Sequence, residues 1–290
     1  MHKQFDQAAG IRKMNNIKPV RVIAFTSGKG GVGKTNVSVN IGIALSQMGQ
    51  RVVLMDGDMG LANVDILLGV YPQFNLSHVL SGEKTLDEIM IEGPSGLRVI
   101  PGASGIQKMS ELTTVEQASV IHAFSEIDRD LDVLIVDTAA GISASVVNFV
   151  RACQEIIVVI CDEPTSLTDA YAFIKLLNRD YGLSQFHVIT NMVQSVQQGH
   201  ALFQKLTKVT DRYLDVTLRF AGAVPYDEYL RKSVQKQIPV ILGYPRSRAA
   251  LALKTIAQRI DSWPLKSQAG GYIEFFIERM IQYGSQKDVA

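Results

Sequence analysis

The chain has 290 residues, of which 47% are hydrophobic and 20% charged, and its formal net charge is +1 at pH 7. This length suits one large α/β domain or two smaller ones. A net charge near zero gives no bulk electrostatic attraction to nucleic acid, so we expect no specific DNA binding. The N-terminus carries no apolar signal segment and no stretch is long enough to span a bilayer, so we expect a cytoplasmic location.

The chain has two cysteines, Cys153 and Cys161, and they are not spaced as a metal or redox pair. Cys161 ends an apolar run and Cys153 lies in a predicted helix, so both are most simply core residues. This argues against an iron–sulfur reductase or carrier.

Apolar runs alternate with helical segments along the chain, and most runs are continuous, as in strands covered on both faces. Strands are predicted at Val20–Thr26, Arg51–Asp56, Leu97–Pro101, Asp132–Asp137, Glu155–Cys161, Phe186–Asn191 and Leu218–Val224. Helices are predicted at Thr35–Met48, Val64–Leu68, Thr114–Arg129, Ser143–Ala152, Ser166–Asp180, Gln198–Tyr213 and Arg248–Ser262. The alternation predicts an α/β fold with a doubly wound, mainly parallel sheet that binds ligands at the carboxyl ends of its strands.

A glycine-rich loop joins the first predicted strand to the first predicted helix. It reads G-x-x-x-x-G-K-T, a phosphate-binding loop whose backbone N–H groups and helix dipole cradle a polyphosphate. Lys34 should reach the β- and γ-phosphates, and the Thr35 hydroxyl should help to hold Mg²⁺. The residues predicted to bind nucleotide here are Gly28, Lys29, Gly30, Gly31, Val32, Gly33, Lys34, Thr35 and Asn36.

Lys29 is a second lysine inside this loop. A cation in a tight glycine turn gains nothing for folding, so we predict that it serves a phosphate; the alternative is a solvated surface lysine. The segment KGGVGKT resembles the deviant Walker A loop of the P-loop NTPase family that contains MinD, ParA and the nitrogenase iron protein. The resemblance implies a MinD-type (SIMIBI) fold and an ATPase that dimerises with ATP. It also implies that Lys29 acts catalytically on nucleotide bound by the other subunit, beside Lys34 of its own.

An acidic, glycine-containing segment follows the second predicted strand and looks like a nucleotide switch. Asp56 would be a strand-end acid near Mg²⁺. In the family's matching D-x-D-x-G motif the second aspartate positions or activates the attacking water, which implies that Asp58 is catalytic. The alternative for Asp58 is a capped turn, and Asp65 is most simply a helix cap.

Asp137 ends the apolar run before Thr138-Ala139-Ala140-Gly141. A carboxylate there is typical of a Walker B acid that holds a Mg²⁺ water, and the alternative is a helix cap. Small residues suit a loop close to a γ-phosphate. The resemblance implies that the Gly141 amide senses that phosphate.

Two further positions face the base side of a nucleotide in this fold. Asn191 ends the sixth predicted strand, and Pro225, Tyr226 and Asp227 follow the seventh. The resemblance implies that they hold adenine, and the sequence lacks the N-K-x-D element that selects guanine. Loop capping at both positions is the alternative.

The C-terminal residues after a linker at 264–271 place apolar side chains on one face of a short helix. These are Tyr272, Ile273, Phe276, Ile277, Met280 and Ile281, of which the last five are the predicted membrane residues. Such a helix can lie in a membrane interface, which would associate the protein peripherally with the inner membrane. The alternative is docking on the protein's own surface or on a dimer partner, and Arg279 beside two glutamates gives the polar face little cationic character.

The N-terminal run Asp6-Gln7-Ala8-Ala9-Gly10-Ile11-Arg12 resembles the DQAxxLR activator motif of the MinD relatives that limit flagellar number, with isoleucine in place of leucine. The resemblance implies that Asp6, Gln7, Ala8 and Arg12 bind the signal-recognition-type GTPase FlhF and stimulate its GTP hydrolysis. It also implies a σ54-dependent flagellar activator (FlrA or FleQ) and flagellar switch-complex proteins as partners. A disordered polar tail is the alternative.

We therefore expect three parts: an N-terminal activator segment (1–19), a MinD-like ATPase domain (20–263), and a linker with an amphipathic helix (264–290). Two other functions stay open. One is a ParA-type partitioning ATPase that binds non-specific DNA through Lys205, Lys208, Arg212 and Arg219. The other is a scaffold that binds nucleotide without turnover.

Overall fold

A computed structural model describes residues 19–58, 64–102, 121–124, 131–265 and 273–285. Its centre is one eight-stranded sheet in the order β3-β4-β2-β5-β1-β6-β7-β8. All neighbouring strands are parallel except the short edge pair β3–β4. The predicted α/β fold with a doubly wound, mainly parallel sheet is confirmed.

The seven predicted strands are all present, with ends shifted by up to three residues. The sheet is formed by β1 (Arg21–Ser27), β2 (Val52–Gly57), β3 (Ile91–Glu92), β4 (Arg98–Ile100), β5 (Val133–Ala140), β6 (Glu155–Cys161), β7 (Gln185–Val193) and β8 (Thr217–Pro225). The two-residue β3 was not predicted, because so short a strand has no detectable periodicity.

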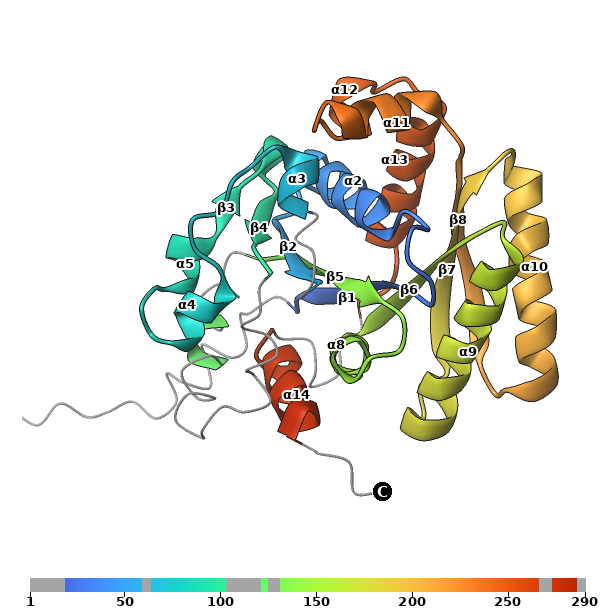
Figure 1. Cartoon of the computed structure of the whole chain (residues 1–290), viewed down its shortest axis with the longest axis horizontal. Coiled ribbons are helices and arrows are strands. Elements are labelled where there is room, and N and C mark those ends of the chain that lie inside the picture. Colours follow the sequence, from blue (N-terminus) through green and yellow to red (C-terminus); the bar gives the residue numbers. More distant parts are fainter. Residues whose placement is uncertain (1–18, 59–63, 103–120, 125–130, 266–272, 286–290) are drawn as a thin grey trace, which may run out of the picture.

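Helices cover both faces of the sheet (Figure 1). They are α2 (Lys34–Gln47), α3 (Val64–Leu68), α4 (Leu76–Leu80), α5 (Leu86–Ile89), α8 (Ala144–Ala152), α9 (Pro164–Tyr181), α10 (Val196–Tyr213), α11 (Glu228–Gln235), α12 (Val240–Gly243), α13 (Arg248–Asp261) and α14 (Ile273–Ser285). Four short helices, α4, α5, α11 and α12, escaped prediction. The helix predicted at Thr114–Arg129 lies mostly outside the described residues.

Two hydrophobic cores lie on opposite faces of the sheet. One face is covered by α2, α3, α12 and α13, and packs on β1 through Ile23 and Phe25. The other is covered by α4, α5, α8, α9, α10 and α14, and packs on β1 through Val22 and Ala24. Because successive strand residues point to opposite faces, a strand buried on both sides is apolar throughout.

The C-terminal helix α14 packs on α8, as Figure 1 shows with α14 in red. Phe276, Ile277, Met280 and Ile281 are all buried in this contact. The predicted apolar face of the helix is therefore covered by the protein's own domain in this structure. The side chain of Ile273 lies outside the described residues.

An arginine of α8 joins three helices at this place. The Arg151 guanidinium lies 3.8 Å from the ring centre of Tyr283 in α14 and 4.1 Å from that of Tyr181 at the end of α9. Cation–π contacts of this kind contribute about 0.5–2 kcal/mol each. The apolar contact and the two rings together fix α14 on α8.

Candidate functional site

The glycine-rich loop spans the gap between β1 and α2, at the carboxyl end of the central strand. The Ser27 hydroxyl donates to the Lys29 carbonyl over 2.9 Å, and Gly33 caps the helix, so that Lys34 is its first residue. Asn36 follows in the first turn. Backbone N–H groups of the loop and the positive end of α2 therefore converge here, as phosphate binding requires.

Three loop glycines have a visible structural reason. Gly31 and Gly33 have φ values of 80° and 82°, in the left-handed region that other residues rarely adopt. A Cβ on Gly28 would lie 2.4 Å from the Asp169 carbonyl carbon, so the loop touches the backbone of α9. The loop is thus held against α9 as well as α2.

A buried ion pair connects the loop to β5. Lys34 Nζ donates to Asp137 Oδ1 over 3.0 Å, and the two side chains are only 7% and 1% exposed. The other carboxylate oxygen, Asp137 Oδ2, is buried without a hydrogen-bond partner among the described residues. An orphaned anionic oxygen beside a phosphate loop fits a Mg²⁺ water, so the donor set suits ATP or ADP with Mg²⁺. Thr35 would supply the hydroxyl ligand from α2.

Asp56 and Asp137 are direct neighbours in the register of β2 and β5. Asp56 is buried, and its carboxylate accepts from the backbone N–H groups of Asp58 (3.0 Å) and Val64 (3.5 Å). Both carboxylates therefore lie at the same strand ends, beside the phosphate loop. The half-buried Asp58 lies one residue past β2, and residues 59–63 lie outside the described residues.

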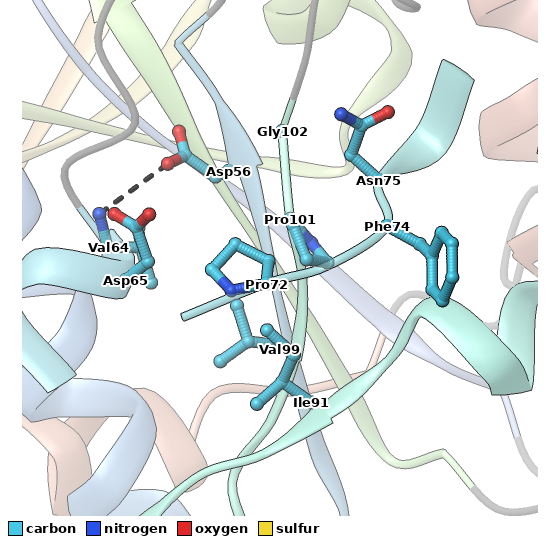
Figure 2. A pocket seen from close by; sticks show the side chains of 10 residues that line it. All are labelled: Asp56, Val64, Asp65, Pro72, Phe74, Asn75, Ile91, Val99, Pro101 and Gly102. Carbon is cyan, nitrogen blue, oxygen red and sulfur yellow. Dashed lines mark hydrogen bonds between the residues drawn. The ribbon is translucent and has the colours of Figure 1, made fainter. Parts of the chain in front are cut away.

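A cavity of about 160 Å³ opens beside Asp56 (Figure 2). Its walls are mainly apolar, with Phe74, Pro72 and Pro101 opposite the carboxylates of Asp56 and Asp65. Gly102 closes this wall: a Cβ there would lie 2.1 Å from the Asp56 carbonyl oxygen. The position of Asp56 therefore depends on a glycine that sequence reasoning did not identify.

Lys29 is held by residues of its own chain. Its ammonium contacts the Glu163 carboxylate and lies 2.8 Å from Thr165 Oγ1 at the start of α9. The hydrogen bond with Glu163 raises the pKa of Lys29, which therefore stays charged. Neither partner was predicted, although Glu163 follows the end of β6 much as Asp58 follows the end of β2.

Asn191 contacts the loop directly. Its side-chain amide donates to the Val32 carbonyl over 2.8 Å, and a Cβ on Gly33 would lie 2.4 Å from that amide nitrogen. The predicted base-side residue therefore also supports the phosphate loop.

Asp227 holds two helices. One carboxylate oxygen accepts from the Tyr229 N–H at the start of α11 and the other from the Ala249 N–H in α13, both over 2.9 Å. Tyr226 beside it is exposed, and Pro225 ends β8. The carboxylate thus makes the capping contacts that were its alternative role, and the tyrosine ring is free to meet a ligand.

Gly141 follows β5 with a φ of 95°. Its amide donates to the Ser27 carbonyl over 2.9 Å, which joins the predicted sensor segment to the start of the phosphate loop. Gly141 and the phosphate loop therefore lie in contact.

The remaining predicted features are placed as follows. Both cysteines are buried, and they lie on opposite faces of the sheet. No group of three or more His, Cys, Asp or Glu side chains suited to a metal occurs in the part of the chain that the structure describes. Within the same residues, no helix is long and apolar enough to cross a membrane. The predicted partner-binding residues Asp6, Gln7, Ala8 and Arg12 lie outside the described residues.

This geometry is that of a P-loop nucleoside triphosphatase. The family model ParA, described as "NUBPL iron-transfer P-loop NTPase", matches residues 18–261. The structure also resembles MinD from Pyrococcus horikoshii complexed with Mg-ADP (TM-score 0.67, 26% identity, 84% of this chain and 96% of that one). MinD of the Aquifex aeolicus MinC:MinD complex gives the same TM-score and identity, over 86% and 100% of the two chains.

Proteins that are similar in sequence define more narrowly the kind of P-loop NTPase to which this chain belongs. The chain is 56% identical over 273 residues to the antiactivator FleN of Pseudomonas aeruginosa, covering 94% of this chain and 98% of that protein. It is 31% identical to the flagellum site-determining protein YlxH of Helicobacter pylori, covering 96% and 99%. The chain therefore belongs to the FleN/FlhG branch of the ParA/MinD family of P-loop ATPases, as its N-terminal motif and the two lysines of its glycine-rich loop predicted.

Replacing Gly102 by alanine should displace Asp56, because the added Cβ has no room beside its carbonyl. A misplacement of about 1 Å at a catalytic site can lower turnover by roughly a hundredfold. We expect the rate of phosphate release by Gly102→Ala to fall by this factor at saturating ATP and Mg²⁺, while the variant still binds nucleotide.

Gly243→Ala is the control, since its Cβ would meet only the Ile238 side chain at 3.3 Å. Wild-type turnover in Gly102→Ala would show that the position of Asp56 does not depend on this glycine.

Proposed function

We propose that this protein is an ATP-dependent dimeric switch that regulates the number and placement of flagella. The observation that carries the proposal is the pair of lysines in one phosphate loop. Lys34 faces inward to Asp137, whereas Lys29 lies one-third exposed at the edge of the site. Lys34 is placed to contact nucleotide bound by its own chain, and Lys29 is placed to contact nucleotide bound by a second copy of the protein.

The dimer would form face to face across the carboxyl ends of the strands. Lys29 would exchange its contacts with Glu163 and Thr165 for a phosphate bound by the partner subunit. Because the ammonium already has an anionic partner, the phosphate must compete with Glu163, so dimerisation should require the triphosphate rather than ADP.

Hydrolysis would reset the switch. Asp58 directly follows β2, the strand that carries Asp56 near its carboxyl end, and we assign it the positioning or deprotonation of the attacking water. The Asp56 and Asp137 carboxylates and the Thr35 hydroxyl would hold Mg²⁺, whose charge offsets the negative charge that develops on the phosphates. Lys34 would stabilise the same charge from the loop.

Flagellar regulation is supported by the relatives, which are named as an antiactivator and a flagellum site-determining protein. We assign three kinds of partner to the switch: a σ54-dependent flagellar activator of the FlrA/FleQ type, an FlhF-type GTPase that binds residues 6–12, and flagellar switch-complex proteins.

We also propose that α14 exchanges its site on α8 for the inner membrane surface. The same side chains, Ile273, Phe276, Ile277, Met280 and Ile281, would then enter the lipid interface. Release of the helix when ATP binds would place the dimer at the membrane. Docking of the helix on α8 again after hydrolysis would return the monomer to the cytoplasm.

Lys29→Ala tests the dimer. The variant should still bind ATP through Lys34 and the loop amides but stay monomeric with a non-hydrolysable ATP analogue, as measured by light scattering after size exclusion. Lys84→Ala is a matched control, because Lys84 is also about one-third exposed and paired with a glutamate, Glu88. Normal dimerisation of Lys29→Ala would exclude the role of this lysine in the partner's site.

Asp58→Ala tests hydrolysis. Loss of a general base typically costs about 10²- to 10⁴-fold in rate, and we expect phosphate release to fall within that range. Asp65→Ala is the control on the neighbouring helix. If wild type and Asp58→Ala are equally inactive at saturating ATP with partners present, the protein is a nucleotide-binding scaffold instead.

Deletion of residues 1–19 tests the activator segment. The shortened chain should hydrolyse ATP at the wild-type rate, because the phosphate loop and its acids are all retained. It should no longer stimulate GTP hydrolysis by the FlhF-type GTPase, measured as GDP formation. Undiminished stimulation would contradict the assignment of residues 6–12.

A further inference from the structure

Three neighbouring strands carry an ionisable residue at or near their amino ends, on the same face of the sheet. Arg21 of β1, Glu155 of β6 and His187 of β7 point to the face covered by α13, and they are only 5%, 8% and 6% exposed. Buried charged groups rarely add net stability compared with apolar side chains. Their presence at the amino edge of an otherwise apolar face therefore indicates that they position a neighbouring part of the chain.

What they fix is Trp263, which follows α13. His187 Nε2 lies 3.1 Å from Glu155 Oε2, and the indole of Trp263 stacks on the His187 ring with 3.7 Å between centroids and 19° between planes. Arg21 Nη2 donates to the Trp263 carbonyl over 2.6 Å. Burial lowers the pKa of Arg21, which Glu155 and Asp261 oppose by their charge. Trp263 is thus held by its ring and by its backbone.

A cavity of about 530 Å³ lies beside this tryptophan, at the end of the strands opposite the phosphate loop. Its rim includes Pro19, the first described residue, and Leu265, the last one before the segment that leads to α14. Three polar rim residues are already paired: Gln50 and Asp261 with each other, and Asp132 with Arg51. Leu265 is 51% exposed, so this rim offers an apolar contact that the described part of the chain leaves uncovered.

Chain length determines how far a partner held by the N-terminal segment can be from this cavity. Pro19 lies seven positions after Arg12, and seven extended residues span at most about 25 Å. A globular domain of a few hundred residues is roughly 45 Å across. A GTPase that grips residues 6–12 is therefore larger than its tether is long, and it must lie close to the rim at Pro19.

We infer that this amino edge is a second docking surface for the GTPase, which places an apolar patch of its own against Leu265 and the edge of Trp263. The inference rests on the proposed function of residues 6–12. The surface lies a full strand length, about 23 Å for the seven residues of β1, from the phosphate loop. GTPase binding is then compatible with the ATP dimer, and the GTPase lies next to the linker of α14.

The test is the affinity of the full-length chain for the GTPase in its GTP-analogue state. Leu265→Asp should weaken binding by at least about tenfold, because a carboxylate would be buried in an apolar contact. Leu251→Asp is a matched control, since Leu251 on α13 is 53% exposed and lies away from the cavity. ATP hydrolysis without the GTPase should be unchanged in both variants.

The outcomes separate this inference from the function on which it rests. Equal affinities of Leu265→Asp and Leu251→Asp for the GTPase would overturn the docking surface. So would a lower affinity of Leu265→Asp that is explained by self-association of this variant in the absence of the GTPase. If deletion of residues 1–19 also leaves GTPase binding unchanged, the activator assignment itself is wrong.

A second readout uses the only tryptophan of the chain, Trp263. With 5-hydroxytryptophan incorporated at this position, its emission can be excited selectively in the presence of the GTPase. We expect the emission to shift on binding in the wild-type chain. An unchanged emission at saturating GTPase would overturn the inference even if Leu265→Asp failed to fold.

Discussion

The buried ion pair between Lys34 and Asp137 joins the two motifs on which the nucleotide site is built. Lys34 begins α2, and Asp137 lies in β5, which pairs with β1 on one side and with β2 on the other. Removing one member of a buried pair typically costs about 3–5 kcal/mol, because the other charge is left without a partner. The phosphate loop and the two acids Asp56 and Asp137 on β2 and β5 are therefore aligned by this one contact.

Parallel pairing explains why so much of this site was predictable. In a parallel sheet every carboxyl strand end lies at one edge, so Ser27, Asp56, Asp137 and Asn191 had to converge once their strands were recognised. Continuous apolar runs identified those strands without knowledge of their neighbours. The same logic identified the MinD-like class, because the loop that carries Lys29 is a contiguous stretch of sequence.

The unpredicted parts depend on contacts between distant segments or on short elements. Glu163 and Thr165 lie more than 130 positions from Lys29, and nothing in their local sequence marks them as its partners. Gly102 matters only because its backbone passes against that of Asp56, which no local pattern reveals. At Asp227 the sequence left two roles open, adenine binding and capping, and only the fold shows that its carboxylate accepts hydrogen bonds from the starts of two helices. The short helices α4, α5, α11 and α12 contain too few residues for helical periodicity to emerge.

The 18-residue helix α9 makes contacts at both of its ends that concern different parts of the protein. Beside its first turn, Glu163 and Thr165 hold the exposed lysine of the loop, and at its last residue Tyr181 stacks on the arginine that grips the C-terminal helix. A helix of this length is a stiff rod of about 27 Å. One rigid helix therefore connects the residues that hold Lys29 with the ring that contacts Arg151, and through Arg151 with the C-terminal helix.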